Sequence, residues 1–341
     1  MSLRLAIVAD DLTGALDSAE PFARAGLRVV VATSVEALHA LPEDLSDVVA
    51  VNTESRGLPP QDAELAVRQA WALLSPHDPA CLFKKIDSRM KGNVVPEIAA
   101  LAEASGRGAA IIAPAIPAMG RFVRDSAVTG FGVDAAIPIV ARPGWEIPDC
   151  ADLAAMTEIA RRIWSRCSDT IAAGASGLAE ALALEIAGAR APVSAPPRPA
   201  SAGERRMIMA IGSRDPITLA QVAMLTETGL TGGWPIVLQP PPGQLDPVMV
   251  SAELAERALA CARKQAVTTL LLSGGDTASA FIRLAEIKLL VPLGSLAPGM
   301  PVARGTGAGV TYTLITKSGG FGGPESLIAA YRAWSGYPEA E

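Results

Sequence analysis

Residues 81–104 of this 341-residue chain read CLFKKIDSRMKGNVVPEIAALAEA and contain one complete strand–loop–helix unit. The first residues form an apolar run typical of a buried strand, and Val94–Ala104 place apolar side chains on one helical stripe. Four cations, one carboxylate, one hydroxyl and one glycine lie between the two elements. A helix that begins after such a loop offers free backbone N–H groups and the positive end of its dipole, which favours a bound anion.

This charged loop, residues 84–93, admits two interpretations. It is a solvent-facing, salt-bridged βα loop, as most charge runs are. Alternatively, Asp87 accepts a proton from a substrate hydroxyl while its cationic neighbours hold a carboxylate or a phosphate. The loop by itself leaves both interpretations open.

The composition excludes several classes of protein. Half of the residues are hydrophobic and the net charge is −6, which argues against a general nucleic-acid-binding surface. The four cysteines form no CxxC pair, which indicates reduced thiols rather than a disulfide framework or a zinc site. The two histidines, His39 and His77, lie in loop-like contexts, so a Ser-His-Asp hydrolase and a His-ligated metal centre rank low. No apolar run reaches membrane-spanning length and no signal-peptide core is present, so we expect a cytoplasmic protein.

The first half of the chain alternates strands and helices, which predicts a mostly parallel sheet covered by helices. Strands are expected at residues 4–9, 27–32, 47–52, 81–86, 109–113, 137–140 and 170–173, and helices at 13–25, 62–74, 94–104, 152–167 and 176–187.

A second α/β pattern follows a proline-rich break, which reads as a linker at residues 191–205. Strands are expected at 206–211, 235–239, 267–273, 290–293 and 310–316, and helices at 216–228, 247–264, 277–286 and 324–334. The predicted fold class is therefore α/β, with two three-layer domains at residues 1–190 and 206–341, mostly parallel sheets, and the active site in the cleft between the domains.

Polar residues follow several strands of the first half, where parallel α/β sheets bind ligands. Asp10 and Asp11 suit a proton acceptor, a hydroxyl-binding group or a magnesium ligand, although Asp11 or Thr13 is expected to cap the next helix. Loops after later strands contain two arginines, Arg56 and Arg121. The forked guanidinium group of arginine suits a carboxylate or a phosphate. Asn52 and Ser55 are candidate hydroxyl-binding residues.

The second half carries three glycine-containing loops that suit phosphates. They are Gly212-Ser213, the strand–Gly274-Gly275–helix element with Asp276 and Thr277, and residues 317–323, which include Gly319 and Gly320. Glycines let backbone N–H groups approach an anion closely, although a plain tight βα turn explains a single such loop equally well. The P-loop order is absent, and no strand–GxGxxG–helix element is present.

A kinase accounts for both halves, because acids and cations suit a small polar acid and glycine loops suit nucleotide phosphates. Phosphoryl transfer requires positioning, charge neutralisation and usually Mg²⁺, so the lack of a well-placed histidine or cysteine does not count against it. Two alternative functions remain: an NAD(P)-dependent oxidoreductase of a similar hydroxy acid, and a non-catalytic sugar-acid-binding protein.

The motifs resemble those of the four-carbon acid sugar kinases. Residues 9–15 (ADDLTGA) resemble the opening motif of that family, and residues 84–93 resemble its central Lys-x-Asp-Ser-x-x-Arg-Gly-Asn motif. The stretches at 52–56, 114–121, 212–213, 274–278 and 317–322 follow in the family's order. The chain departs from the pattern at Lys91, where the family has Arg, and at Gly320, where it has Asn.

The resemblance implies an ATP-dependent phosphotransferase acting on a terminal hydroxyl of a short sugar acid such as 3-oxo-tetronate, threonate or erythronate. It implies a sugar-acid-binding N-terminal domain and a nucleotide-binding C-terminal domain, with ATP and Mg²⁺ as cofactors; the metal ligands stay unassigned, and a homodimer is possible. The predicted catalytic residues are Asp11 and Asp87. The predicted substrate-binding residues are Asp10, Asn52, Ser55, Arg56, Lys85, Ser88, Arg89, Lys91, Gly92, Asn93 and Arg121. The predicted ATP-binding residues are Ser213, Gly274, Gly275, Asp276, Thr277, Gly319 and Gly320.

Overall fold

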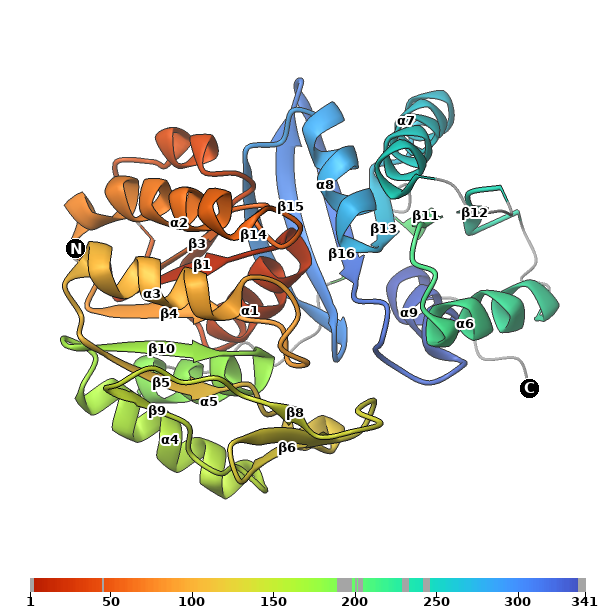
Figure 1. The fold of residues 1–341 in the computed structure, drawn as a ribbon. Helices are drawn as coiled ribbons and strands as arrows, with labels where there is room; N and C mark the ends of the chain where they lie inside the picture. The colour runs from red at the N-terminus through yellow and green to blue at the C-terminus, as the bar shows by residue number, and fades with distance from the viewer. Residues whose placement is uncertain are drawn as a thin grey trace. The chain divides into compact units, whose positions relative to one another are not determined.

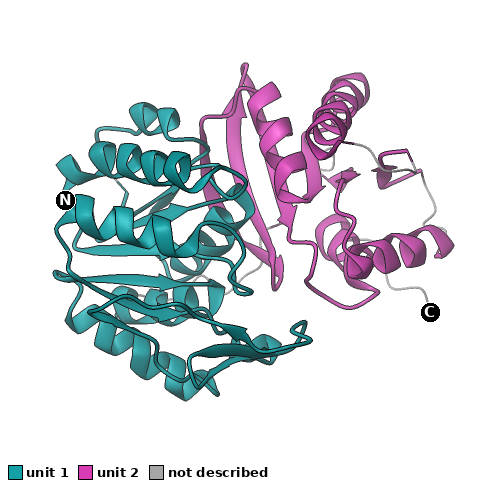
Figure 2. Cartoon of the chain, viewed as in Figure 1, with its two compact units in different colours: residues 1–193 teal, residues 194–341 magenta. Residues whose placement is uncertain are grey.

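The structure is a computed structural model that describes residues 3–44, 46–188, 198–199, 201, 205–228, 233–241 and 246–336. The chain divides into two compact units, residues 1–193 and residues 194–341 (Figure 2). Most of the predicted linker, residues 191–205, lies outside the described residues.

Unit 1 is built on a parallel sheet with the strand order β2-β3-β1-β4-β10-β5-β9. Its strands are β1 Leu5–Ala9, β2 Val29–Ala32, β3 Val48–Asn52, β4 Cys81–Lys85, β5 Ala109–Ala113, β9 Trp145–Glu146 and β10 Thr170–Gly174. In the register of this sheet, Ala9 pairs with both Asn52 and Lys85, and Lys85 also pairs with Gly174. The carboxyl ends of four central strands therefore meet at one edge, as the alternating pattern predicted.

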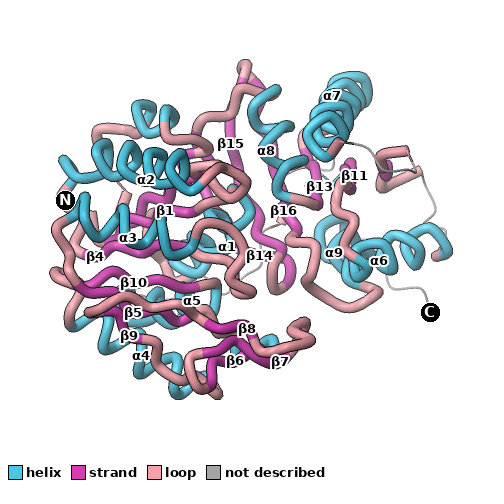
Figure 3. The backbone as a smooth tube through the Cα atoms, viewed as in Figure 1, coloured by secondary structure: helices cyan, strands magenta, loops and turns pink. Residues whose placement is uncertain are grey.

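Helices cover both faces of this sheet (Figures 1 and 3). They are α1 Leu12–Arg24, α2 Pro60–Leu74, α3 Val94–Ser105, α4 Leu153–Ser165 and α5 Ser176–Ala187. Successive strand residues point to opposite faces. Lys84 on β4 reaches Glu97 of α3, and the next residue, Lys85, reaches Gly14 of α1. Helices α2 and α3 therefore pack together on one face, and α1, α4 and α5 on the other.

A small antiparallel sheet, β6-β7-β8, lies outside the main sheet of unit 1. Its strands are β6 Arg121–Arg124, β7 Ala127–Gly130 and β8 Ile137–Pro138, and three 3₁₀ helices complete the unit at η1 Glu36–Ala40, η2 Ser75–His77 and η3 Pro117–Met119. The strand predicted at 137–140 thus exists only in part and pairs with β7 rather than with the parallel sheet. The hairpin β6–β7 was missed, because its short strands alternate too few residues to show a period.

Unit 2 contains a mixed sheet with the order β12-β11-β13-β16-β15-β14. Its strands are β11 Ile208–Ile211, β12 Ile236–Leu238, β13 Thr269–Ser273, β14 Leu289–Ala297, β15 Met300–Gly307 and β16 Val310–Lys317. Strands β12, β11, β13 and β16 run parallel, whereas β14, β15 and β16 form an antiparallel meander. Strand β15 was not predicted, because its glycine-rich end reads as a loop; it closes in a two-residue turn with positive φ at Ala308 and Gly309.

The helices of unit 2 are α6 Pro216–Glu227, α7 Pro247–Gln265, α8 Gly275–Leu284 and α9 Ser326–Ser335. Helices α6 and α9 pack against each other, and α7 packs against α8. Helices α6 and α7 both begin with Asp-Pro: Asp215 Oδ1 accepts the N–H of Ile217 at 3.0 Å, and Asp246 Oδ1 accepts that of Val248 at 2.8 Å. Both helix starts were predicted at their prolines, since proline suits the first turn and aspartate the cap.

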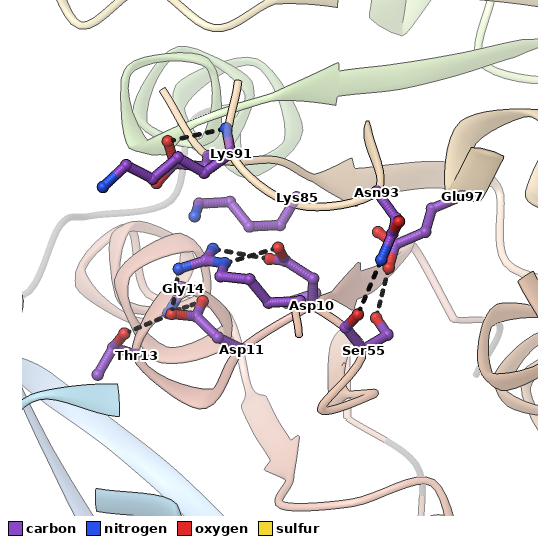
Figure 4. A network of polar contacts seen from close by, with 12 residues as sticks. Asp10, Asp11, Thr13, Gly14, Ser55, Lys85, Lys91, Asn93 and Glu97 are labelled. Atoms are coloured by element: carbon purple, nitrogen blue, oxygen red, sulfur yellow. Dashed lines mark hydrogen bonds and ion pairs between the residues drawn. The ribbon is translucent and has the colours of Figure 1, made fainter. Parts of the chain in front are cut away.

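A buried ion pair fixes the strand ends in unit 1. The Lys84 ammonium lies 2.8 Å from Glu97 Oε2 with both side chains at most 1% exposed, and it donates to the carbonyl oxygen of Lys85 at 2.8 Å. Ser55 Oγ donates to the other oxygen of Glu97 at 2.5 Å (Figure 4). Thr53 Oγ1 lies 2.7 Å from Ser55 Oγ and donates to the Ala9 carbonyl at 2.9 Å. One network therefore ties together the ends of β1, β3 and β4 and the first turn of α3.

Removing one member of this pair is expected to destabilise unit 1 strongly. Glu97→Leu leaves the Lys84 charge buried without its partner, so the free energy of unfolding should fall by roughly 3–5 kcal/mol. The double variant Lys84→Met/Glu97→Leu removes both charges and should recover most of that loss. Urea unfolding of Lys84→Met, Glu97→Leu and the double variant measures the coupling energy between Lys84 and Glu97. Losses that simply add in the double variant would contradict a coupled buried pair.

Candidate active site

Asp10 and Arg56 form a two-point ion pair at the end of β1. Arg56 Nε donates to Asp10 Oδ2 at 2.8 Å and Nη2 donates to Asp10 Oδ1 at 2.9 Å, while Nη1 donates to Asp11 Oδ2 at 2.7 Å. Asp10 is only 3% exposed, and burial opposes its ionisation. The charges of Lys84 and Arg56 and the Arg56 hydrogen bonds outweigh burial and hold the pKa of Asp10 below its usual value. The guanidinium group of Arg56 already donates to the carboxylates of Asp10 and Asp11. Arg56 therefore binds acidic groups of its own chain.

Asp11 is the N-cap of α1, which confirms the prediction that Asp11 or Thr13 caps this helix. Its Oδ1 accepts the backbone N–H of Gly14 at 2.9 Å, and its Oδ2 accepts the Thr13 hydroxyl at 2.8 Å (Figure 4). With Arg56, three donors point at this carboxylate.

Asp87 shapes the charged loop after β4. Its Oδ1 accepts the backbone N–H groups of Arg89 at 2.8 Å and Lys91 at 3.3 Å. The loop then turns through positive φ at Met90 and Gly92. A Cβ on Gly92 would lie 3.2 Å from Asp10 Oδ2, so the glycine lets the loop lie against the Asp10 carboxylate. The loop therefore joins the ends of β1 and β4, as the anion-site interpretation requires.

Other predicted residues hold the surrounding loops. Asn93 donates its amide to the carbonyl oxygens of Ser55 and Leu58 at 3.1 and 2.9 Å. Asn52 donates to the Thr33 carbonyl at 3.1 Å and accepts the N–H of Glu54 at 3.1 Å. The side-chain amides of Asn52 and Asn93 are thus used on backbone groups.

Arg121 and Ser88 are brought together from separate loops. Arg121 Nη1 donates to Ser88 Oγ at 2.5 Å, and its Nε and Nη2 donate to the Phe131 carbonyl at 3.1 and 2.8 Å. Arg121 is 4% exposed, and burial together with the nearby charge of Arg89 lowers its pKa. This contact links the charged loop to the small sheet.

Three predicted cations keep their charged groups available within the part of the chain that the structure describes. The side chains of Lys85, Arg89 and Lys91 make no hydrogen bond and no ion pair with a described residue. Lys85 is 6% exposed, and its Nζ lies 2.7 Å from where a Cβ on Gly14 would be. The absent side chain of Gly14 therefore makes room for the Lys85 ammonium group beside the first turn of α1.

Asp17 also belongs to this region, although the sequence motifs assigned it no role. It lies one helical turn after Gly14 on α1 and is partly exposed. Burial raises the pKa of Asp17 to about 6, against the opposing charge of Lys85 and a hydrogen bond from Ser176. Its spacing of three residues from Gly14 was the available signal, since residues three apart share a helix face.

Unit 2 contains a pocket of about 280 Å³ at the carboxyl ends of β11 and β13. Its lining residues are Gly212, Ser213, Arg214, Pro247, Val250, Ser251, Gly274, Asp276 and Thr277. Four of the predicted ATP-binding residues, Ser213, Gly274, Asp276 and Thr277, therefore share one pocket, and Gly275 begins the adjacent helix α8. Arg214 and the α7 residues of the lining were not predicted, because helix α7 has no motif that marks a ligand.

Two glycines of this pocket are required by close packing. A Cβ on Gly212 would lie 2.0 Å from Thr277 Oγ1. Gly274 has φ of 105°, a conformation that strongly favours glycine, and it precedes the free N–H groups at the start of α8. Such a helix start suits an anion.

The loop at residues 318–323 lies next to the same pocket. A Cβ on Gly319 would lie 2.5 Å from Ser213 Oγ, whereas a Cβ on Gly320 would meet its nearest atom, Asp215 Oδ2, only at 3.6 Å. Gly319 is therefore required by the close approach to Ser213. Gly320, which departs from the family pattern, is not required by packing within the chain.

Side chains beneath this loop hold its carbonyl groups. Thr218 Oγ1 donates to the Gly319 carbonyl at 2.9 Å, and Gln221 Nε2 donates to those of Phe321 and Gly323 at 3.0 and 2.9 Å. Lys317 is fully buried and donates to Ser318 O at 3.1 Å and Gly319 O at 3.3 Å. Burial lowers the pKa of Lys317 to about 8. The N–H groups of Ser318 and Phe321 donate to backbone carbonyls at 3.4 and 3.3 Å, whereas those of Gly319 and Gly320 have no such partner among the described residues.

Comparison with known proteins agrees with this division of the chain. Residues 5–142 match the family domain described as "Sugar-binding N-terminal domain", and residues 237–327 match the one described as "Nucleotide-binding C-terminal domain". The two matches together span more than half of the chain and fall one in each unit. The chain belongs to the four-carbon acid sugar kinase family.

Curated relatives of this family carry kinase names. The D-threonate kinase of Bordetella bronchiseptica is 29% identical over 96% of this chain and 97% of its own length. The 3-oxo-tetronate kinase of Methylobacterium radiotolerans is 40% identical over 36% of this chain and 30% of its own length. The sequence identity is thus higher in the match that covers part of this chain than in the match that covers nearly all of it.

Solved structures share the fold. A protein from Salmonella typhimurium LT2 matches with a TM-score of 0.74 at 18% identity, covering 97% of this chain and 100% of that one. A protein of this family from Bordetella bronchiseptica, solved as a domain-swapped dimer with bound citrate, matches with a TM-score of 0.50 at 26% identity over 98% of both chains.

The Asp10–Arg56 pair predicts a pH-dependent loss of stability. Because the pKa of Asp10 is lower in the folded than in the unfolded chain, the stability that its ionisation contributes is present above about pH 4 and is lost as the pH falls below that value. Asp10→Asn should lower the free energy of unfolding by roughly 1–3 kcal/mol at pH 7, and the difference from wild type should shrink toward pH 3.

Urea unfolding of wild type and Asp10→Asn from pH 7 to pH 3 measures this difference. Asp62→Asn, an exposed carboxylate on α2, is the matched control and should change the free energy of unfolding by less than about 0.5 kcal/mol at every pH. A wild-type to Asp10→Asn difference that stays constant with pH would count against a lowered pKa for Asp10.

Proposed function

We propose that this protein is an ATP-dependent kinase that phosphorylates a terminal hydroxyl of a small four-carbon sugar acid, such as 3-oxo-tetronate, threonate or erythronate. The observation that carries the proposal is the complementary chemistry of the two units. Unit 1 gathers carboxylates and available cations at the carboxyl ends of β1 and β4, and unit 2 forms a pocket from glycine loops and a helix start. The kinase names of the family relatives support the same reaction.

The cations of unit 1 suit an anionic substrate. Lys85, Arg89 and Lys91 come from one strand end and its loop, and none of their charged groups is paired within the described residues. We propose that they bind the carboxylate of the sugar acid or the phosphate that is transferred. The related structure that contains citrate supports this assignment, because citrate is a small hydroxy-acid anion bound by a related chain.

The pocket of unit 2 suits ATP. The N–H groups at the start of α8 and in the loop at 318–323 offer donors to phosphate oxygens. Pro247 and Val250 of α7 give the pocket an apolar wall, which suits the base or the ribose of a nucleotide. Arg214 at the rim adds a charge for the phosphates.

Magnesium fits this assignment as the companion of the nucleotide. No group of three or more His, Cys, Asp and Glu able to hold a metal ion occurs among the residues that the structure describes. Mg²⁺ in kinases typically needs only one or two carboxylates, because phosphate oxygens and water complete its shell. Asp276, which lines the pocket, is the side chain that would hold it. The bound ion would neutralise phosphate charge.

The reaction needs little covalent chemistry from the chain. The substrate hydroxyl attacks the γ-phosphorus, its proton passes to a carboxylate, and ADP leaves. We propose that the cations of unit 1 neutralise the charge that develops on the transferred group.

We place the enzyme in the cytoplasm and propose that it forms a homodimer. Its four cysteines are all free thiols, which fits a reducing compartment. Of the helices in the described residues, none has the length and apolarity that crossing a membrane requires. The domain-swapped dimer of the Bordetella relative supports the dimer.

A coupled assay of ADP release tests the function. Four- and five-carbon sugar acids are offered one by one with Mg-ATP, and at least one four-carbon acid should give turnover in the range of about 1–100 per second. Calorimetric titration with Mg-ATP and with NADH separates the rivals. Binding of NADH without binding of ATP would indicate an oxidoreductase, and acid binding without ADP release would indicate a binding protein.

Gly319→Ala tests the nucleotide pocket directly. The new Cβ would lie 2.5 Å from Ser213 Oγ and 3.0 Å from Asp215 Cβ, so the loop must shift and its phosphate donors with it. The KM for ATP should rise by about tenfold or more, while the KM for the sugar acid changes little. The matched control is Gly323→Ala in the same loop, where a Cβ would have no neighbour within 4 Å. If Gly319→Ala and Gly323→Ala have the same KM for ATP, Gly319 is not part of the nucleotide site.

A further inference from the structure

Lys317 is a buried cation of unit 2 to which the proposed kinase assigns no role. It is the last residue of β16, and its side chain is fully buried. Its ammonium group donates to Ser318 O at 3.1 Å, to Gly319 O at 3.3 Å and to Thr218 Oγ1 at 3.3 Å. These three bonds use all three donors of the ammonium group, and every acceptor is neutral. Within the part of the chain that the structure describes, no carboxylate forms an ion pair with Lys317.

The charge of Lys317 is not neutralised in the way that the other buried lysine is. Lys84 of unit 1 lies 2.8 Å from a carboxylate oxygen of Glu97. The carboxylate that acts on Lys317 electrostatically is that of Asp215, at the start of α6, and its Oδ1 already accepts the N–H of Ile217 at 3.0 Å. A buried charge that lacks an ion-pair partner lowers stability. Its presence at the edge of a ligand pocket therefore points to a function.

The two carbonyl groups that this ammonium group holds set the direction of two N–H groups. The carbonyl of Ser318 shares a peptide group with the N–H of Gly319, and the carbonyl of Gly319 shares one with the N–H of Gly320. Neither of these peptide bonds is cis. In a planar trans peptide group, the C=O and N–H bonds point in opposite directions. Both N–H groups therefore point away from the buried ammonium group, and neither has a backbone partner among the described residues.

These two N–H groups lie beside the nucleotide pocket of unit 2. The loop that carries them joins β16 to α9 and is held against α6 (Figure 3). A Cβ on Gly319 would lie 2.5 Å from the hydroxyl oxygen of Ser213, which lines the pocket. Successive backbone N–H groups that face one side form a concave site for an anion. A cation bound to the carbonyl oxygen polarises the peptide group and strengthens its N–H as a donor.

We propose that Lys317 is a positioning residue of the nucleotide site, which holds two successive peptide groups so that the N–H groups of Gly319 and Gly320 bind phosphate oxygens of ATP. The inference rests on the proposed kinase function and states how unit 2 holds the phosphates. Lys317 does not contact the nucleotide, because its ammonium group is buried and fully used on the chain. Its positive charge lies behind the two peptide groups and adds to their attraction for phosphate.

Lys317→Met tests the proposal by calorimetric titration of the full chain with AMP, ADP and ATP in the presence of Mg²⁺. Burial lowers the pKa of Lys317 to about 8, so titration at pH 7 keeps the ammonium form predominant. The affinity for ATP should fall by about tenfold or more in the variant. The loss should be smaller for AMP, because attraction to the buried charge grows with the number of phosphates. Absence of ATP binding to the wild type would refute the nucleotide site itself, and this assignment with it.

Gln221→Met is the matched control for a general effect on the shape of the loop. Gln221 is also fully buried, and it donates to the carbonyl groups of Phe321 and Gly323 in the same loop. It is neutral and holds neither of the two peptide groups in question. Its replacement should change the affinities for AMP and ATP by the same factor, about threefold or less. Equal losses of ATP affinity in Gln221→Met and Lys317→Met, or a Lys317→Met loss that is the same for AMP and ATP, overturn the proposal.

A measurement on the wild type keeps the test decisive if Lys317→Met folds poorly. The chain is labelled with ¹⁵N-glycine, and the amide resonances of the loop are assigned by single glycine-to-alanine substitutions. Addition of Mg-ATP should shift the amide resonances of Gly319 and Gly320, because their N–H groups gain a phosphate acceptor. The resonance of Gly323, in the same loop, should shift less. If saturating ATP leaves the resonances of Gly319 and Gly320 in place, the proposal is wrong.

Discussion

The ion pair between Lys84 and Glu97 is the interaction on which the site in unit 1 depends. Two lysines follow each other on β4, and successive strand residues point to opposite faces. Lys84 turns to α3, where Glu97 and a carbonyl oxygen satisfy its buried charge. Lys85 turns to α1 and α5, where its ammonium group stays available. A fully desolvated charge is tolerated only with such a partner, so the pair sets both the position of α3 and the direction in which Lys85 points.

The same principle explains how the other carboxylates of unit 1 are held. Asp10 and Asp11 are held by Arg56 and by the first turn of α1, and they fix the end of β1. Asp87 folds its own loop. Burial raises the pKa of Asp17, whereas the charges around Asp10 lower its pKa. In unit 2, Thr218, Gln221 and Lys317 donate to carbonyl oxygens of the glycine loop and hold it in place.

The elements of both units followed closely from the sequence wherever a regular period was present. Strand β5 and helix α5 lie at the predicted residues, and the Asp-Pro helix starts at 216 and 247 were found because the cap and the proline act locally. Strand β15 was missed because glycines near its end resemble a loop, and only pairing with β14 and β16 makes them a strand. The hairpin β6–β7 was missed because its strands are too short to show a period. The α7 wall of the nucleotide pocket was missed because Pro247 and Val250 meet Gly212 and Gly274 only in the folded chain.

The sequence by itself determined the α/β pattern, the order of the motifs and the residue types of the site, because these depend on local periodicity and on the family motifs. Only the tertiary structure decided which of these residues pair within the chain and which keep their charged groups available. It pairs Lys84 with Glu97 and leaves Lys85 available, and it uses the fork of Arg56 on Asp10. Partners that lie far apart in the chain meet only when the sheet forms, and the burial that shifts a pKa exists only in the packed state.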